Sequence, residues 1–81
     1  MHPGKYLAAI QPGLMSKTAL ATKLNMARNT LYSFLRGEKR LDPTVATILG
    51  ELHEDAAFWL RLQHEHDLSQ VERHRLVPAR L

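Results

Sequence analysis

Residues 16–40 read SKTALATKLNMARNTLYSFLRGEKR, and this stretch decides the fold. Its first part predicts a short helix that begins after Ser16, because serine is a favoured N-cap residue. The inward positions of this helix recur at helical spacing and are filled by Leu20, Ala21 and Leu24. Asn25 then interrupts the helix, since asparagine is one of the few residues besides glycine that tolerate the left-handed backbone region.

A second short helix is predicted over residues 28–36. It carries three apolar side chains on one face, Leu31, Phe34 and Leu35, and Gly37 is a natural residue to close it. The connection between the two helices spans about four residues, 24–27. A turn of that length sets two helices at a large angle, as in a helix-turn-helix.

The remainder of the chain shows helical periodicity and no sustained strand pattern. Pro3 suits the first position of a helix, and Pro12-Gly13 predicts a helix stop. Asp42, which is followed by Pro43, and Asp55 are predicted N-caps of two further helices. The spacing of Ser69 and Glu72 is that of a capping box, which predicts a short sixth helix ending near Arg75. We therefore expect an all-α fold of five to six helices.

Length and composition limit the fold and the function. The chain has 81 residues, which allow one small domain with one core. Because it has no Cys, disulfides and thiolate metal sites are excluded. No apolar run approaches the ~18 residues of a membrane-spanning helix. We expect one compact domain over residues 1–76, a short frayed tail over 77–81, no membrane association and a cytoplasmic location.

The net charge of +3 is unevenly distributed. Residues 1–40 hold seven basic residues and one acidic residue, Glu38, for a net charge of +6, whereas residues 41–81 carry −3. A basic half joined to an acidic half favours two surfaces with different kinds of partner. The alternative is a solvated mixture of charges.

The helix over residues 28–36 has a polar face opposite its apolar one. Five side chains that can donate hydrogen bonds share it: Arg28, Asn29, Tyr32, Ser33 and Arg36. Arginine and asparagine pair with guanine and adenine edges, so this helix suits the DNA major groove. Lys17, Lys39 and Arg40 lie nearby in the sequence as candidates for phosphate contact. The alternative is a polar surface on an ordinary helical domain.

Residues 16–37 resemble the helix-turn-helix of the Cro/phage-repressor (XRE) family. The matching positions are Leu20-Ala21, Asn25, Met26, Leu31 and Gly37. The resemblance implies a lambda-repressor-like fold in which Arg28, Asn29 and Ser33 face the bases. The residues then expected at the DNA backbone are Lys17, Thr30, Tyr32, Arg36, Lys39 and Arg40. Two residues depart from the pattern: Asn25 replaces a glycine, and Ala27 replaces a Ser or Thr cap, at a cost of typically ~1 kcal/mol of helix stability.

Three further segments resemble the HigA-type antitoxins: His2-Pro3-Gly4, Gly37-Glu38-Lys39-Arg40 and the WLRLQHEHDL stretch over residues 59–68. This resemblance covers residues 2–68. It implies a homodimer that binds the palindromic operator of its own operon through the major groove. It also implies neutralisation of a HigB-type toxin, a ribonuclease that cuts translated mRNA. The alternative is a stand-alone repressor of phage or plasmid origin without a toxin.

Trp59, Gln63 and Asp67 follow one another at i, i+4 and i+8 and therefore share one helix stripe. We expect Trp59 to anchor the core together with Leu20, Ala21, Leu31 and Gly37. Gln63 and Asp67 are placed to bond backbone groups at the end of their own helix or of a neighbour. The alternative is that the stripe packs against a second subunit or the helix-turn-helix.

No enzyme, cofactor or metal site is expected. The sequence lacks a nucleophile–base pair, a carboxylate dyad and a phosphate-binding glycine loop. His64 and His66 are two residues apart and so cannot form an i, i+4 metal pair. A weaker hypothesis assigns the acidic residues of the second half to a basic toxin, against the alternative of a solvated acidic face: Glu51, Glu54, Asp55, Glu65 and Asp67.

Overall fold

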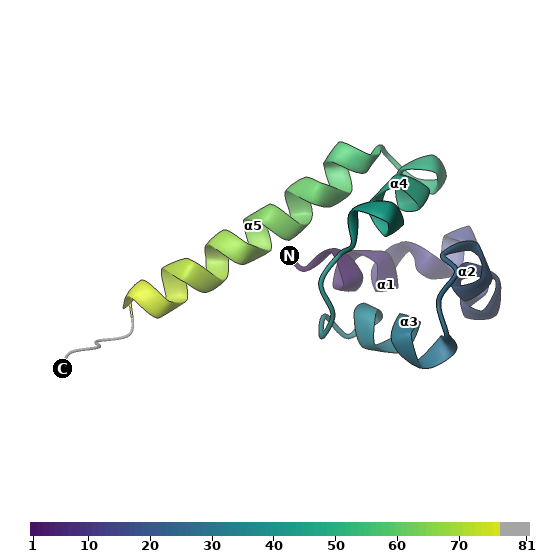
Figure 1. The fold of residues 1–81 in the computed structure, drawn as a ribbon, viewed down its shortest axis with the longest axis horizontal. Coiled ribbons are helices and arrows are strands. Elements are labelled where there is room, and N and C mark those ends of the chain that lie inside the picture. Colours follow the sequence, from purple (N-terminus) through teal and green to yellow (C-terminus); the bar gives the residue numbers. More distant parts are fainter. Residues whose placement is uncertain (77–81) are drawn as a thin grey trace.

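The computed structural model describes the backbone of residues 1–76 and the side chains of residues 1–73. Within this part the chain forms helices and no strand: α1 (Pro3–Leu14), α2 (Lys17–Lys23), α3 (Arg28–Leu35), α4 (Pro43–Leu52) and α5 (Ala56–Leu76) (Figure 1). The all-α prediction is confirmed. The tail predicted over residues 77–81 lies outside the described residues.

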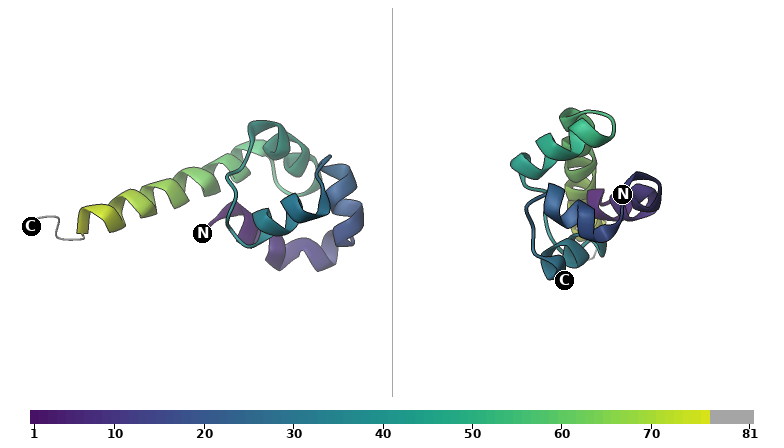
Figure 2. Two further views of the ribbon diagram at one scale, coloured as in Figure 1. Left: turned by 60° about the horizontal axis from the view of Figure 1, so that its bottom comes forward. Right: turned by 90° about the vertical axis from the view of Figure 1, so that its right-hand side faces the viewer.

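Helices α1 to α4 form a globular head, and α5 packs mainly on α4 and also touches α1. The left view of Figure 2 shows the second half of α5 extending past the other helices. The described molecule is accordingly elongated, with extents of 49, 25 and 21 Å. None of its described helices is both long enough and apolar enough to cross a membrane.

The core of the head takes its largest side chains from all five helices. Those that are almost completely buried are Leu7, Leu20, Leu31, Phe34, Leu49 and Trp59. Ala21, another expected anchor, is also buried. The indole N–H of Trp59 donates to the carbonyl of His53 (2.8 Å), so this large side chain enters the core without an unpaired donor.

The helix-start signals act as the sequence predicts. Ser16 Oγ accepts from the Ala19 amide (3.1 Å), and Asp42 Oδ1 accepts from the Thr44 amide (2.6 Å). Asp55 Oδ1 accepts from the Phe58 amide (2.8 Å). Each cap pairs a backbone N–H that would otherwise lack a partner at a helix N-terminus.

Two predicted boundaries are wrong. Pro12-Gly13 does not stop the first helix, because α1 continues to Leu14. Pro12 has no N–H to donate to the carbonyl of Ala8, four residues earlier. Ala8 is exposed, so water can donate to that carbonyl instead. Ser69 does not begin a sixth helix, since it lies inside the 21-residue α5. No glycine or proline interrupts residues 56–76, so the helix has no reason to break there.

Candidate nucleic-acid interface

Helices α2 and α3 are joined by the turn that the sequence predicts. Asn25 has a positive φ of 55°, and the Met26 amide donates back to the Ala21 carbonyl (2.9 Å). Ala27 stands at the N-cap of α3 and provides no side-chain hydrogen bond. The chain thus changes direction within four residues, 24–27, and α3 begins at Arg28 without a side-chain cap.

Helix α3 buries Leu31 and Phe34 and turns its polar side chains outward. Arg28 and Asn29 are exposed, whereas Ser33 is half-buried. A shallow hollow on this face brings Lys39, from the loop after α3, next to three residues of the helix, Asn29, Thr30 and Ser33. Two of the residues expected to read bases, Asn29 and Ser33, therefore lie beside two expected at the DNA backbone.

A second hollow lies along the other edge of α3. It is lined by Lys17, Tyr32, Leu35 and Arg36. The ammonium of Lys17 lies 5.6 Å from the centre of the Tyr32 ring, within the range of a cation–π contact. Lys17, at the start of α2, thus places a positive charge at the edge of α3, where a DNA backbone contact was expected.

The end of α3 is shaped by Gly37, whose φ of 81° few other residues adopt. The Glu38 amide donates to the Ser33 carbonyl (3.0 Å), which folds the following loop back onto the helix. The Arg36 guanidinium then donates from Nε and Nη2 to the two Glu38 oxygens (3.1 and 3.2 Å). Hydrogen bonding and charge from the pair lower the pKa of Glu38 and raise the pKa of Arg36.

The loop after α3 is tied to α5 by a polar cluster that we call the α5 clasp: Arg40, Leu41, Gln63 and Asp67. Arg40 Nη1 and Nη2 donate to the two oxygens of Asp67 (2.8 and 3.0 Å). Gln63 accepts from the buried Leu41 amide (2.8 Å) and donates to Asp67 (3.0 Å). Gln63 therefore bonds a backbone group, as expected, whereas Asp67 bonds side chains instead. The hydrogen bonds from Arg40 lower the pKa of the Asp67 carboxyl.

The N-terminal His-Pro-Gly segment holds α1 against α3 and α5. His2 is buried, and its Nδ1 accepts from the Gly4 amide (2.8 Å), which caps α1. The edges of its ring contact Phe34 of α3 and His66 of α5, with ring centres 5.8 and 4.9 Å apart. Burial, followed by the charge of His66, lowers the pKa of His2. Sequence reasoning missed this role, although an N-terminal His-Pro-Gly was a visible signal.

The outer face of α5 carries exposed apolar side chains. Leu60, Leu68 and Val71 are 42%, 50% and 54% exposed. Together with His64 they occupy positions i, i+4, i+8 and i+11, which is one stripe of a helix. We call these four residues the α5 stripe. Among the described side chains, no group of three His, Cys, Asp or Glu residues could hold a metal ion.

Among solved structures, the chain is similar in fold to PA4674 from Pseudomonas aeruginosa, crystallised in complex with its 28-bp operator DNA. The TM-score is 0.76 at 24% identity, and the match covers all of this chain and 94% of that one. At this identity the likeness shows the fold.

No protein-family model matches the sequence. Virulence-associated protein A′ of Dichelobacter nodosus is 33% identical over 73 residues, covering 86% of this chain and 64% of that protein. Virulence-associated protein A of the same organism is 34% identical over 77 residues, covering 90% of this chain and 76% of that protein. The chain therefore belongs to the virulence-associated protein A family.

Proposed function

We propose that this chain is a transcriptional repressor that places α3 in the major groove of operator DNA. The observation that carries the proposal is the outward face of α3, where Arg28, Asn29 and Ser33 lie on the second helix of a helix-turn-helix. Lysines border that face on both sides, Lys39 in one hollow and Lys17 in the other. The fold likeness to a protein solved on its operator supports the same reading.

The proposed roles divide into base contacts and phosphate contacts. Arg28, Asn29 and Ser33 specify the sequence, because only groups that reach base edges carry sequence information. Lys17, Thr30, Tyr32 and Lys39 position the helix on the DNA backbone. Arg36 and Arg40 were expected there too, but each pairs with a carboxylate, Glu38 or Asp67, which offsets its positive charge. The proposed activity is binding, without catalysis, in the cytoplasm.

We infer that the DNA-bound form is a homodimer. A single short recognition helix buries too little surface to be specific alone, and two-fold partners read half-sites roughly 34–36 Å apart. The α5 stripe is the surface that we assign to the second copy. Leu60, Leu68 and Val71 of this stripe are exposed apolar side chains. Leu68 and Val71 belong to the second half of α5, which extends past the head (Figure 2).

The finer proposal is a HigA-type antitoxin that neutralises a HigB-type toxin. Its support is the resemblance of residues 2–68, whose flanking motifs form contacts with one another. His2 contacts His66, and Arg40 pairs with Asp67. The motifs thus work as one structural unit, as expected if this chain is built like those antitoxins.

DNA binding is tested by selecting duplexes from a randomised pool with the purified full chain. The selected and a scrambled duplex are then titrated at several salt concentrations. We expect a two-fold-symmetric selected sequence, bound on the order of 10³-fold or more tightly than the scrambled one. Equal affinity for both duplexes would remove the proposed repressor function.

Toxin neutralisation is tested separately, by co-expressing the chain with the gene next to its own. Co-purification and suppression of growth arrest are the expected results. A neighbour that is neither toxic nor bound, together with intact operator binding, would favour the stand-alone repressor instead.

A further inference from the structure

The ion pair at the end of α3 involves Glu38, the one acidic residue among residues 1–40. Glu38 lies in the hollow that also holds Asn29 and Ser33, on the face that we assign to the bases. It accepts two hydrogen bonds from Arg36, in a side-by-side arrangement that uses Nε and Nη2. A carboxylate on a surface that we propose to bind DNA would repel the phosphates, so its presence there needs a physical reason.

The backbone fixes this pair before the side chains meet. Gly37 turns the chain through its positive φ, and the Glu38 amide is bonded to the Ser33 carbonyl. Exposed ion pairs are weak partly because two long side chains must be ordered to form them. Here the carboxylate is already folded back toward the helix, two residues from its partner, and the contact is bidentate.

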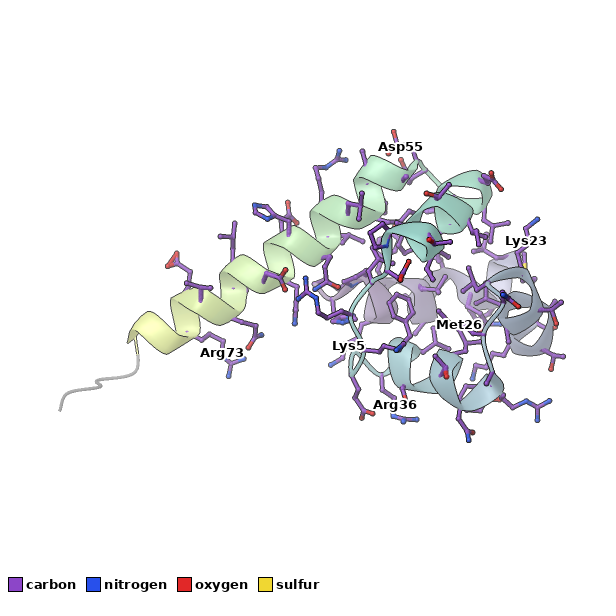
Figure 3. All side chains as sticks on the ribbon, viewed as in Figure 1. Lys5, Lys23, Met26, Arg36, Asp55 and Arg73 are labelled. Atoms are coloured by element: carbon purple, nitrogen blue, oxygen red, sulfur yellow. The ribbon has the colours of Figure 1, made fainter. Side chains whose placement is uncertain are left out.

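Arg36 also reaches a third residue. Its Nη2 donates to the Ser33 hydroxyl oxygen (3.3 Å), so one guanidinium joins Glu38 to Ser33. Figure 3 shows Arg36 on the outer side of α3, turned away from α4. We call Ser33, Arg36 and Glu38 the α3 relay.

The Ser33 hydroxyl therefore behaves unlike two other hydroxyls in the helices. Thr22 and Thr47 donate to the carbonyls of Thr18 and Pro43, four residues earlier (3.2 and 3.0 Å). Ser33 accepts from Arg36, and in the described part of the chain its hydroxyl donates to no carbonyl. A hydroxyl has one hydrogen to donate, and that of Ser33 is therefore not used within the helix. With the guanidinium on its oxygen, that hydrogen is directed away from Arg36 and is available to an acceptor outside the protein.

We propose that Arg36 and Glu38 are positioning residues that hold the Ser33 hydroxyl as a hydrogen-bond donor toward a base edge. The base it reads is one with an acceptor in the major groove, a purine N7, a guanine O6 or a thymine O4. This inference rests on the proposed DNA-binding function and replaces the expected phosphate contact of Arg36. Glu38 is then present to hold Arg36, which explains its place on a basic surface.

The test compares three single variants and one double variant: Arg36→Ala, Glu38→Ala, Ser33→Ala and Arg36→Ala/Glu38→Ala. Each is titrated with the duplex selected by the unmodified chain and with its scrambled counterpart. Each single variant should lower the selected-to-scrambled affinity ratio by about fivefold, the effect of one hydrogen bond. The double variant should lose no more than the singles, because all three residues act through one hydroxyl.

Glu51→Ala serves as the control, since it removes the same charge from an exposed position on α4. It should leave the affinity ratio unchanged. In the free protein, the Arg36 Nε–H should give a slowly exchanging NMR signal that Glu38→Ala abolishes. That measurement examines the relay without DNA.

Three outcomes overturn the inference. Arg36→Ala could weaken both duplexes equally and flatten the salt dependence by about 0.9, as loss of one phosphate contact would. Glu38→Ala could leave the ratio unchanged, or the Nε–H signal could be absent from the unmodified chain. If the unmodified chain fails to discriminate between the duplexes, the proposed function fails as well, which separates that case from failure of the relay alone.

Discussion

Gly4 lies so close to the carbonyl of Phe34 that an added Cβ would overlap it, whereas nothing lies within 4 Å of a Cβ added at Gly13. Both glycines belong to α1. Gly4→Ala should therefore lower the free energy of unfolding by about 1–3 kcal/mol, the usual effect of overpacking. Gly13→Ala should raise it by up to about 1 kcal/mol, because alanine favours helix.

Chemical denaturation of the two variants measures this difference. The same loss of stability in both would contradict the close approach of α1 to α3. A loss confined to Gly4→Ala would show that the third residue of the His-Pro-Gly segment is needed for packing.

The residues on the outer face of α3 and at its edge should respond differently to substitution. Arg28→Ala and Asn29→Ala should each cost about 1–3 kcal/mol in binding to the selected duplex and relax the preference at one base pair. Lys17→Ala and Lys39→Ala should weaken binding to every sequence alike and reduce the salt slope by about 1. Salt-dependent titration of both duplexes separates the two effects. Unchanged base preference in Asn29→Ala would mean that α3 lies in another register on DNA.

At the scale of elements, the α5 clasp fixes the loop that follows α3. The Leu41 amide is buried and bonded to Gln63 Oε1, so Gln63→Ala leaves it without an acceptor. We expect a loss of about 1–3 kcal/mol in the free energy of unfolding and faster hydrogen exchange at the Leu41 amide. Gln70→Ala, on an exposed position of the same helix, should stay within about 0.5 kcal/mol of the unmodified chain. Equal stability of both variants would show that the clasp does not hold the loop.

At the scale of the whole molecule, α5 carries the exposed α5 stripe, and the part of it that holds Leu68 and Val71 lies in the half of the helix that extends past the head. Leu68→Glu and Val71→Glu would place a charge in the proposed interface, and we expect both to shift the chain from dimer to monomer. Ser69→Glu adds the same charge on the opposite side of the helix and should leave the dimer intact. Sedimentation velocity distinguishes these results. A dimer that survives Leu68→Glu and Val71→Glu would place the interface elsewhere.

The N-terminal segment should make stability depend on pH. The pKa of His2 is lowered below its usual 6.5, so the unfolded chain binds a proton more readily than the folded one. Stability from this residue is present above pH 6.5 and is lost as the pH falls toward the folded pKa. Burial and the charges of His66 and Lys5 favour neutral His2. Hydrogen bonding with the backbone of Lys39, and then the charge of Asp67 on α5, oppose them in part.

Denaturation curves between pH 5 and pH 8 measure this effect. His2→Asn keeps a capping acceptor without a titrating ring, so it should flatten the pH dependence in that window. The lowered pKa values of Asp67 and Glu38 act in the same direction but only near and below 4. An unchanged pH profile in His2→Asn would assign the dependence to another histidine.

Much of the fold could be predicted from local signals. Ser16, Asp42 and Asp55 cap the helices that they were expected to cap, and Asn25 and Gly37 have the positive φ that their positions suggested. The two wrong predictions, at Pro12 and Ser69, were also made from local signals. They failed because a single stop or start residue does not outweigh the hydrogen bonding of the turns around it.

The same distinction between local and long-range signals holds for the candidate site. The sequence by itself determined the helix-turn-helix and the polar face of α3, because a helix repeats every 3.6 residues and its caps act within one turn. Only the tertiary structure decided which residues meet from distant parts of the chain. Arg40 meets Asp67 across 27 residues, and His2 meets His66 across the length of the chain. The packing of α5 on the head brings these residues together. That packing depends on the shape of the whole core and on no local sequence pattern.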